Sequence, residues 1–180
     1  QIPNPGGCRL GARPIDRHIE GLQHMGATIS YHSDDGYFYA KVNGKLQGTT
    51  YTFTKNTHTG TEIMLLAAVL ADGETVLNNA AQEPEVDNMI ELLVGMGARV
   101  KRIKPRIIVI QGVEKLHGCE FVVMPDRNEA VTFAIAAMVT HGDIIVRGAQ
   151  KKFLGPFLDH LKRAHGTWEE KDAQTIRFFV

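Results

Sequence analysis

Segments about 70 residues apart resemble each other in this chain, and this periodicity limits how the chain folds. The sequence KLQG at 45–48 recurs as KLHG at 115–118, and MGA at 25–27 recurs at 96–98. Self-similarity at a fixed period is the signature of a supersecondary unit that has been copied along the chain. We therefore expect a fold assembled from copies of one unit.

Each complete copy shows the same order of patterns. A small, apolar helix ends at Asp-Gly or His-Gly, where a glycine can adopt positive φ, and a short β-branched strand follows. A second helix ends at another glycine, and two strands with period-two alternation close the copy. The unit is therefore βαβαββ, and the first copy lacks its opening strand and helix. The expected helices cover 15–25, 61–71, 86–96, 130–140 and 153–164, and the expected short strands cover 74–77 and 143–146.

Two kinds of helix alternate in this pattern. The segments TEIMLLAAVLA (61–71) and AVTFAIAAMVT (130–140) are apolar nearly all round, which predicts burial on every side. The segment EVDNMIELLVGM (85–96) has one polar face and is expected on the outside. The pattern predicts an α/β fold with buried helices surrounded by sheets and outer helices. An ordinary two-layer α+β sandwich with a duplicated motif is the alternative.

Composition excludes several classes of protein. The chain is 43% hydrophobic and 22% charged, as in globular proteins, and 20 basic residues balance 20 acidic ones. No overall field attracts nucleic acid or an anionic membrane, and no apolar run has the length of a membrane span. Two cysteines are too few for a disulfide scaffold, and the start QIPNPGGC has no secretory pattern. We therefore expect a cytoplasmic protein.

The two cysteines lie in different settings. Cys8 follows two glycines and stands near Arg9 and Arg13, whose guanidinium groups favour a reactive thiolate. An unreactive surface thiol is the alternative for Cys8. Cys119 lies in the apolar segment CEFVVM (119–124), which predicts a strand and a buried, inert thiol.

The segment ARPID (12–16) is a candidate anion site. Pro14 suits the first position of a helix, and the free amide groups of a helix start, together with Arg13, attract anions. A surface ion pair between Arg13 and Asp16 is the alternative.

The segment KNTHTGTE (55–62) is a second candidate at a helix start. Thr57, Thr59 and Thr61 are possible N-caps, and Lys55 adds positive charge, so a phosphate group fits. The Gly-Lys-Ser/Thr order of a P-loop is missing. An N-cap beside an exposed lysine is the structural alternative.

Other polar residues have structural interpretations. Asp126 or Asn128 caps the helix of the next copy, and Glu83 and Glu85 stabilise a helix start. The eight histidines lack metal-ligand spacing, so we expect no metal and no cofactor.

These residues also carry a resemblance. The segments PGGCRLGARPIDRHIEGLQHMGATI, KLQG, TGTE, LADGETVLNNAAQEPEV, GVEKLHG and MPDRNEA resemble, in this order, the UDP-N-acetylglucosamine enolpyruvyl transferases (1-carboxyvinyltransferases). The resemblance covers essentially the whole chain. It implies transfer of enolpyruvate from phosphoenolpyruvate to the 3'-hydroxyl of UDP-N-acetylglucosamine, the first committed step of peptidoglycan synthesis. It also implies two inside-out α/β domains, each with three βαβαββ units, and a cleft between them that binds both substrates.

The resemblance assigns roles to two segments. Cys8 corresponds to the cysteine that protonates the enolpyruvyl methylene carbon and is alkylated by fosfomycin. Arg13 corresponds to an arginine near the phosphate of phosphoenolpyruvate and the nucleotide. The resemblance further assigns uracil binding to Pro14, Ile15, Asp16 and Arg17, and contact with UDP to Lys55, Asn56, Thr57 and His58.

The chain departs from the family in sequence and in length. The family loop SVGATEN is THTGTEI (57–63) here, and PDRNEAVT (125–132) also differs from the usual residues. Residues 1–125 match two repeat units of the cysteine-bearing domain, the first truncated, and residues 126–180 match a third unit that begins the other domain. Because much of the family's active site has no counterpart here, we expect no transferase activity from this chain alone.

Truncation has a structural consequence and leaves two alternative functions. The apolar faces of the incomplete first unit need cover, so either the third unit completes the domain or two chains associate. An enzyme like enolpyruvylshikimate phosphate synthase is one alternative function, although such enzymes lack the GGC and ARPID segments. A non-catalytic module that binds a nucleotide sugar is the other.

Overall fold

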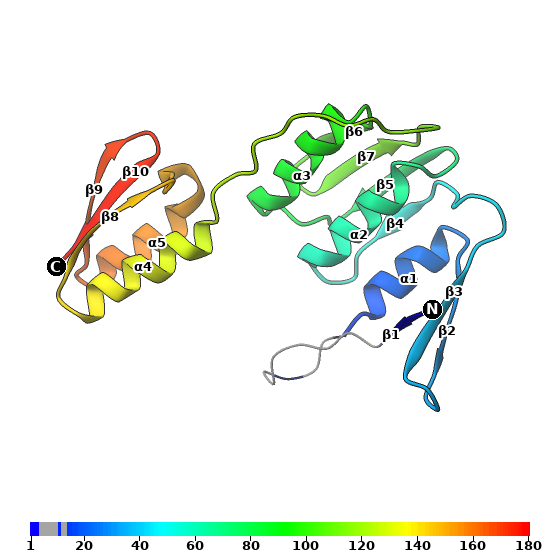
Figure 1. Ribbon diagram of the computed structural model, residues 1–180, viewed down its shortest axis with the longest axis horizontal. Coiled ribbons are helices and arrows are strands. Elements are labelled where there is room, and N and C mark those ends of the chain that lie inside the picture. Colours follow the sequence, from blue (N-terminus) through cyan, green and yellow to red (C-terminus); the bar gives the residue numbers. More distant parts are fainter. Residues whose placement is uncertain (4–10, 12–13) are drawn as a thin grey trace. The chain divides into compact units, whose positions relative to one another are not determined.

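A computed structural model describes residues 1–3, 11 and 14–180, and it divides into two compact units, Gln1–Val122 and Val123–Val180. Each unit is described by itself (Figure 1). The helices are α1 (Asp16–His24), α2 (His58–Ala68), α3 (Pro84–Gly95), α4 (Arg127–Val139) and α5 (Lys151–Arg163). The strands are β1 (Ile2–Pro3), β2 (Thr28–His32), β3 (Tyr37–Lys41), β4 (Thr50–Thr52), β5 (Glu74–Asn78), β6 (Arg99–Lys104), β7 (Ile107–Gln111), β8 (Asp143–Arg147), β9 (Thr167–Asp172) and β10 (Thr175–Phe179).

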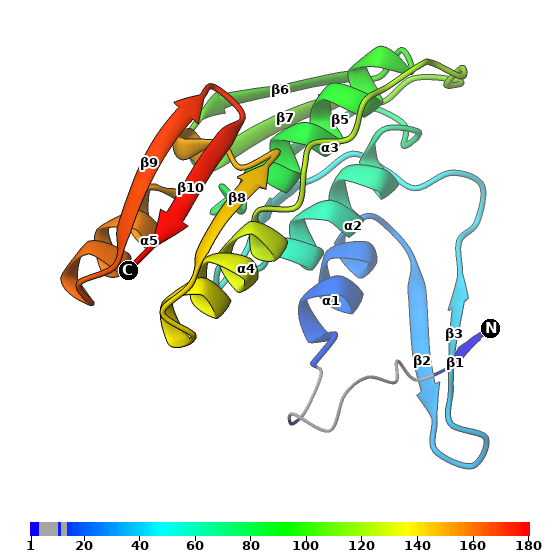
Figure 2. The same ribbon diagram turned by 60° about the vertical axis from the view of Figure 1, so that its left-hand side comes forward.

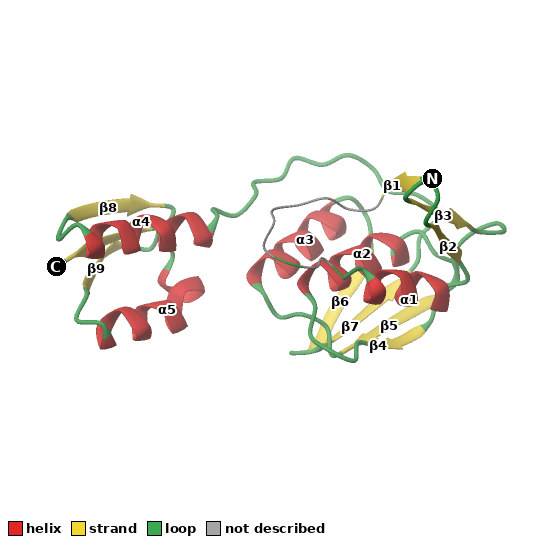
Figure 3. Cartoon of the chain, turned by 90° about the horizontal axis from the view of Figure 1, so that it is seen from below, coloured by secondary structure: helices red, strands yellow, loops and turns green. Residues whose placement is uncertain are grey.

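The elements from β4 to β7 form one complete βαβαββ unit, as predicted. Their sheet has the order β4-β5-β7-β6, in which β4 and β5 are parallel and the other pairs are antiparallel. Helices α2 and α3 connect strands that run in the same direction, so both helices lie over one face of the sheet (Figure 3). Their N-terminal ends therefore lie at the same edge.

Among the described residues, the first copy consists of β1, α1, β2 and β3, which is the βαββ order that remains when the opening strand and helix of the unit are left out. Its three strands have the order β1-β3-β2 (Figure 2). Ile2 of β1 lies opposite Phe38 of β3. Strand β1 has two residues, too few for an alternating pattern to indicate a strand.

The third copy contains α4, β8, α5, β9 and β10, with the sheet order β8-β10-β9. The prediction of a strand at 119–124 is wrong. Strand β8 lies at the edge of its sheet and pairs only with β10 in the described structure, and residues 119–124 form no strand beside it. Val122 is 90% exposed and Cys119 is exposed too, so the prediction of a buried thiol is also wrong.

Each of the two compact units, Gln1–Val122 and Val123–Val180, has its own hydrophobic core. In the first unit, Phe53, Met64 and Ile108 are among the fully buried side chains. Helix α1 approaches α2 closely at Gly21, where an added Cβ would lie 2.4 Å from Sδ of Met64. In the second unit, α5 packs Leu158 into the core that Phe178 of β10 fills.

The helices α2 and α4 are not buried on every side, contrary to the prediction. Leu66 is 49% exposed and Phe133 is 48% exposed, although α2 contacts α1, α3 and the sheet strands β5 and β7, and α4 contacts α5, β8 and β10. The cover expected for these faces, whether another unit or a second chain, stays a prediction. Among the described residues, no helix has the length and hydrophobicity needed to cross a membrane.

Two kinds of residue end the helices. Gly26, Gly73 and Gly97 have φ between 91° and 96°, as the glycine pattern predicts. After α4 and α5 the positive φ falls instead on His141 and His165, one residue before each glycine. The prediction that a glycine adopts positive φ at the end of each helix is therefore wrong for α4 and α5.

Candidate functional site

The first segment of the candidate site is the start of α1. Ile15 is the N-cap residue, with φ −112° and ψ 13°, and its carbonyl accepts a hydrogen bond from the amide of Ile19 at 3.0 Å. The helix starts at Asp16, whose carboxylate complements the positive end of the helix dipole. Pro14 lies one residue outside the cap. The prediction that Pro14 occupies the first helical position is wrong, because the backbone of Ile15 is not yet helical.

The second segment is the start of α2. Thr57 is the N-cap, with extended backbone, and its Oγ1 accepts a hydrogen bond from the amide of Gly60 at 3.2 Å. Of the three candidate threonines, Thr57 is thus confirmed as the cap. Gly60 is buried against Thr57, since an added Cβ would lie 2.5 Å from Cγ2 of that threonine.

The side chains of the loop before α2 are available to a ligand. Lys55 and Asn56 are exposed, whereas Thr57 and His58 are partly buried. Nε2 of His58 lies 3.1 Å from Oε1 of Glu62, one helical turn later, and this contact is an ion pair when the histidine is protonated.

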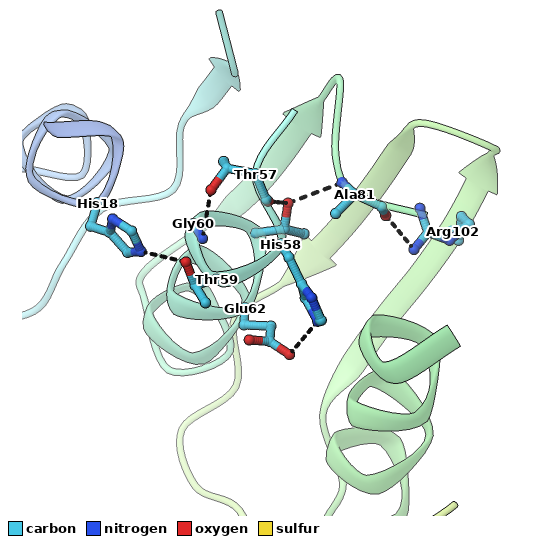
Figure 4. Close-up of polar contacts among 9 residues, drawn as sticks. His18, Thr57, His58, Thr59, Gly60, Glu62, Ala81 and Arg102 are labelled. Carbon is cyan, nitrogen blue, oxygen red and sulfur yellow. Dashed lines mark hydrogen bonds and ion pairs between the residues drawn. The ribbon is translucent and has the colours of Figure 1, made fainter. Parts of the chain in front are cut away.

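A contact between side chains brings the two helix starts together. Nε2 of His18 lies 3.0 Å from Oγ1 of Thr59, which joins the first turns of α1 and α2 (Figure 4). The segments Pro14–Arg17 and Lys55–His58, which the sequence singled out separately, are therefore neighbours. The described part of the chain offers no hydrogen-bond partner to the buried Nε of Arg17 or Nδ1 of His18.

This arrangement suits an anionic ligand. The free amide groups at the two helix starts carry partial positive charge, and Arg17 and Lys55 add full positive charges. Buried polar atoms normally have partners, and these nitrogens of Arg17 and His18 have none among the described residues.

Tyr51 of β4 packs against His24, the last residue of α1. Its ring lies 5.2 Å from that of His24 and 4.9 Å from that of Phe53. Burial, with a further contribution from the carboxylate of Glu20, raises the pKa of Tyr51 to about 12. The phenol therefore stays neutral at physiological pH and serves as a packing group.

The remaining candidates have simpler roles or lie outside the described residues. Cys8 and Arg13 are in the latter group. Asp126, one of two predicted caps, accepts a hydrogen bond from the amide of Asn128 at 2.7 Å. Glu83 is the N-cap residue of α3 without a capping hydrogen bond from its side chain. Among residues 1–3, 11 and 14–180, no group of three or more His, Cys, Asp or Glu side chains is arranged to hold a metal ion.

No motif in the sequence indicates a role for His18 or Glu62 by itself. The spacing of His58 and Glu62, four residues apart at a helix start, was a readable signal for their contact. The pairing of His18 with Thr59 joins positions 41 residues apart and had no local signal.

Comparison with known proteins places this geometry in a family. The profile of EPSP synthase (3-phosphoshikimate 1-carboxyvinyltransferase) matches residues 3–179. The UDP-N-acetylglucosamine 1-carboxyvinyltransferase of Acidobacterium capsulatum is 49% identical over 164 residues, which cover 91% of this chain and 37% of that protein. The chain therefore spans little more than a third of the length of that relative.

Solved structures share the fold. The enolpyruvyl transferase NikO from Streptomyces tendae matches with a TM-score of 0.81 at 23% identity, over 94% of this chain and 43% of that one. An EPSP synthase from Acinetobacter baumannii matches with a TM-score of 0.67 at 24% identity, over 97% of this chain and 41% of that one. These likenesses confirm the predicted fold class of repeated α/β units, present here in incomplete form. The family profile and the relative from Acidobacterium show that the chain belongs to the EPSP synthase family of carboxyvinyltransferases.

Proposed function

We propose that this chain supplies the nucleotide-binding part of an enzyme that transfers enolpyruvate from phosphoenolpyruvate to the 3'-hydroxyl of UDP-N-acetylglucosamine, releasing phosphate. The relative that is 49% identical is named for this activity. The adjacent starts of α1 and α2, joined by His18 and Thr59, support the proposal, because they place amide groups and cations where a diphosphate can bind.

The roles of individual residues follow from this proposal. Pro14, Ile15, Asp16 and Arg17 bind the uracil. The loop of Lys55, Asn56, Thr57 and His58 contacts the diphosphate, for which Lys55 supplies charge-assisted hydrogen bonds.

Two residues outside the described part contribute to the reaction. The hydroxyl oxygen of the sugar bonds to C2 of phosphoenolpyruvate and gives its proton to a base elsewhere in the enzyme, while the thiol of Cys8 delivers a proton to C3, with Arg13 near the phosphate. A proton then returns from C3 to the thiolate as the bond between C2 and the phosphate oxygen breaks, and the phosphate leaves with the proton that the base had taken, so that the enol ether remains. We propose this step as part of peptidoglycan synthesis in the cytoplasm.

A second function is favoured by one observation. The matching family profile and a solved neighbour both carry the name EPSP synthase, so shikimate 3-phosphate is the alternative acceptor.

Thiol reactivity tests the proposal and separates the two acceptors. The chain is alkylated with iodoacetamide and with fosfomycin, and modification of Cys8 and Cys119 is followed by peptide mass spectrometry. Cys119 is exposed and serves as the control thiol within the same chain. We expect both reagents to modify Cys8 faster than Cys119, and UDP-N-acetylglucosamine to change only the rate of Cys8. Equal rates at both thiols, or a response of Cys8 to shikimate 3-phosphate alone, would contradict the proposal.

We expect no turnover by the chain alone, because it spans 37% of the length of its relative and one wall of a cleft cannot exclude water from a reaction. A coupled phosphate-release assay with both substrates measures this directly. Turnover at the rate of an intact enzyme would show that the expectation is wrong.

A further inference from the structure

The loop between β4 and α2 is fixed at its first end by Asn79. Nδ2 of Asn79 donates a hydrogen bond to the carbonyl of Phe53 at 2.9 Å. The backbone of Asn79 has φ 54°, in the left-handed region that asparagine tolerates better than most residues. The chain therefore enters the loop from a defined point.

The second end is fixed by the hydroxyl of Thr61, a fully buried side chain. This hydroxyl donates to the carbonyl of Thr57 at 2.7 Å and accepts from the amide of Ala81 at 3.0 Å. A single buried hydroxyl thus joins the N-cap of α2 to the segment that precedes α3.

Arg102 holds the same peptide segment from the other side. One of its terminal nitrogens donates to the carbonyl of Ala81 at 2.9 Å, the other donates to the carbonyl of Pro105 at 2.8 Å, and Nε donates to Oδ1 of Asp87 at 2.7 Å. The side chain is only 17% exposed, and a planar guanidinium with this many partners has one orientation. Figure 4 shows the resulting series of contacts from Arg102 through Ala81 to Thr57.

Between the two fixed ends, the loop presents Lys55 and Asn56. Both are exposed, and neither side chain has a hydrogen bond within the described part of the chain. These side chains are thus free for a ligand, while hydrogen bonds from Asn79 and Thr61 fix the backbone at both ends of the loop.

We propose that Thr61 and Arg102 are positioning residues for nucleotide binding. They act through the carbonyl of Thr57 and the peptide of Ala81 on the backbone of the loop Lys55–His58. The inference rests on the proposed function, which assigns this loop to the diphosphate of the nucleotide. A loop held in its binding geometry loses less entropy when the ligand binds, so loss of either residue weakens binding.

The first test measures uridine diphosphate binding to the 180-residue chain by calorimetry. Thr61→Val keeps the shape of the side chain and removes the hydroxyl, and Thr61→Ser keeps the hydroxyl. Thr75→Val is the matched control, because Thr75 is equally buried and its hydroxyl has no partner among the described residues. Arg102→Met is compared with Arg99→Met, the same change on the same strand.

We expect Thr61→Val and Arg102→Met to weaken binding about tenfold, and Thr61→Ser, Thr75→Val and Arg99→Met to stay within about twofold of the unmodified chain. A purely structural role predicts that Thr61→Val lowers the free energy of unfolding while the dissociation constant is unchanged below the melting temperature. That result would overturn the inference.

A second readout separates this inference from the proposed function. Amide hydrogen exchange is measured without ligand, with Ile108 and Ile110 in the core strand β7 as references. We expect Thr61→Val to accelerate exchange at Gly60, Thr61 and Ala81 about tenfold more than at the references. If the unmodified chain does not bind uridine diphosphate, the proposed function fails. The exchange pattern still decides whether the hydrogen bonds of Thr61 hold the loop. Uniform acceleration at all of these amides would overturn the inference.

Discussion

His18 and Thr59 join the first turns of two helices through a single contact of 3.0 Å between Nε2 and Oγ1. The two residues are 41 positions apart, and the segments that flank them are those to which the family resemblance assigns uracil binding and contact with UDP. The candidate site therefore depends on how firmly α1 is held against α2.

A double-mutant cycle measures this contact. We expect His18→Ala and Thr59→Val to be coupled by about 0.5 to 1 kcal/mol, the range of a partly exposed hydrogen bond. Urea unfolding of the two single variants and the double variant gives the coupling energy. His32→Ala with Thr59→Val is the control pair, and it should be additive because His32 lies on β2 and contacts Tyr39 instead. Additivity in both cycles would show that the His18 contact contributes nothing.

Thr57 and Gly60 form a matched pair at the start of α2. The family loop SVGATEN has serine and alanine at these two positions. Here the added methyl group of Thr57 occupies the space that a Cβ at position 60 would need. We expect Gly60→Ala to destabilise the chain by about 1 kcal/mol, because it forces the cap residue to move.

The effect of Gly60→Ala on the free energy of unfolding should vanish or change sign once the methyl group of Thr57 is removed. In a Thr57→Ser background we expect Gly60→Ala to be neutral or to stabilise by up to about 1 kcal/mol, since alanine is the better helix former. Thermal unfolding of the four proteins gives the comparison. The explanation is wrong if Gly60→Ala costs the same in both backgrounds.

The raised pKa of Tyr51 leads us to expect that the folded chain loses stability at alkaline pH. Its pKa rises from an ordinary value of 10.0 to about 12 in the folded chain, mainly through burial. A raised pKa means that the unfolded chain loses its proton first, so stability is complete below pH 10 and falls between about pH 10 and pH 12. The full loss is roughly 2 to 3 kcal/mol. Urea unfolding across this range should show a shallower decline for Tyr51→Phe, and parallel curves for the two proteins would contradict the assignment.

The carboxylates beside Arg177 of β10 lead us to expect a loss of stability at acidic pH. Its hydrogen bonds to the carboxylate of Asp143 hold the pKa of that group below the ordinary 3.8. The pKa of Glu169 is also lowered, first by Lys171 and then by Arg177. The stability that these lowered values provide is present above pH 3.8 to 4.5 and is lost as the pH falls through the lowered values.

The two cations can be distinguished by substitution. We expect Arg177→Met to raise the pKa of Asp143 most, and Lys171→Met to raise that of Glu169 most. Titration of the carboxyl carbons by NMR measures each group separately. A larger rise at Glu169 than at Asp143 in Arg177→Met would contradict the assignment.

Local patterns predicted the regular elements well. The copied unit fixed the order of helices and strands, and the polar residues at 57 and 126 marked two helix starts, because capping depends on neighbours within four residues. Glycines ended the helices in the first two copies for the same reason.

The errors arose where the outcome depends on distant partners. The segment 119–124 has the composition of a strand, but a strand forms only where its backbone pairs with a neighbouring strand, and this segment forms no strand. Leu66 and Phe133 lie on helices that are apolar nearly all round, yet about half of each side chain is exposed. Arg102 contributes to the site through three hydrogen bonds that no local pattern indicates.

NMR titration of the 180-residue chain with UDP-N-acetylglucosamine tests the central claim most directly. The account predicts that the amide signals of Asp16–His18 and Lys55–Gly60 shift together along one binding curve, and that those of β8, β9 and β10 do not move. Shifts confined to the second unit, or no shift at millimolar nucleotide sugar, would contradict it.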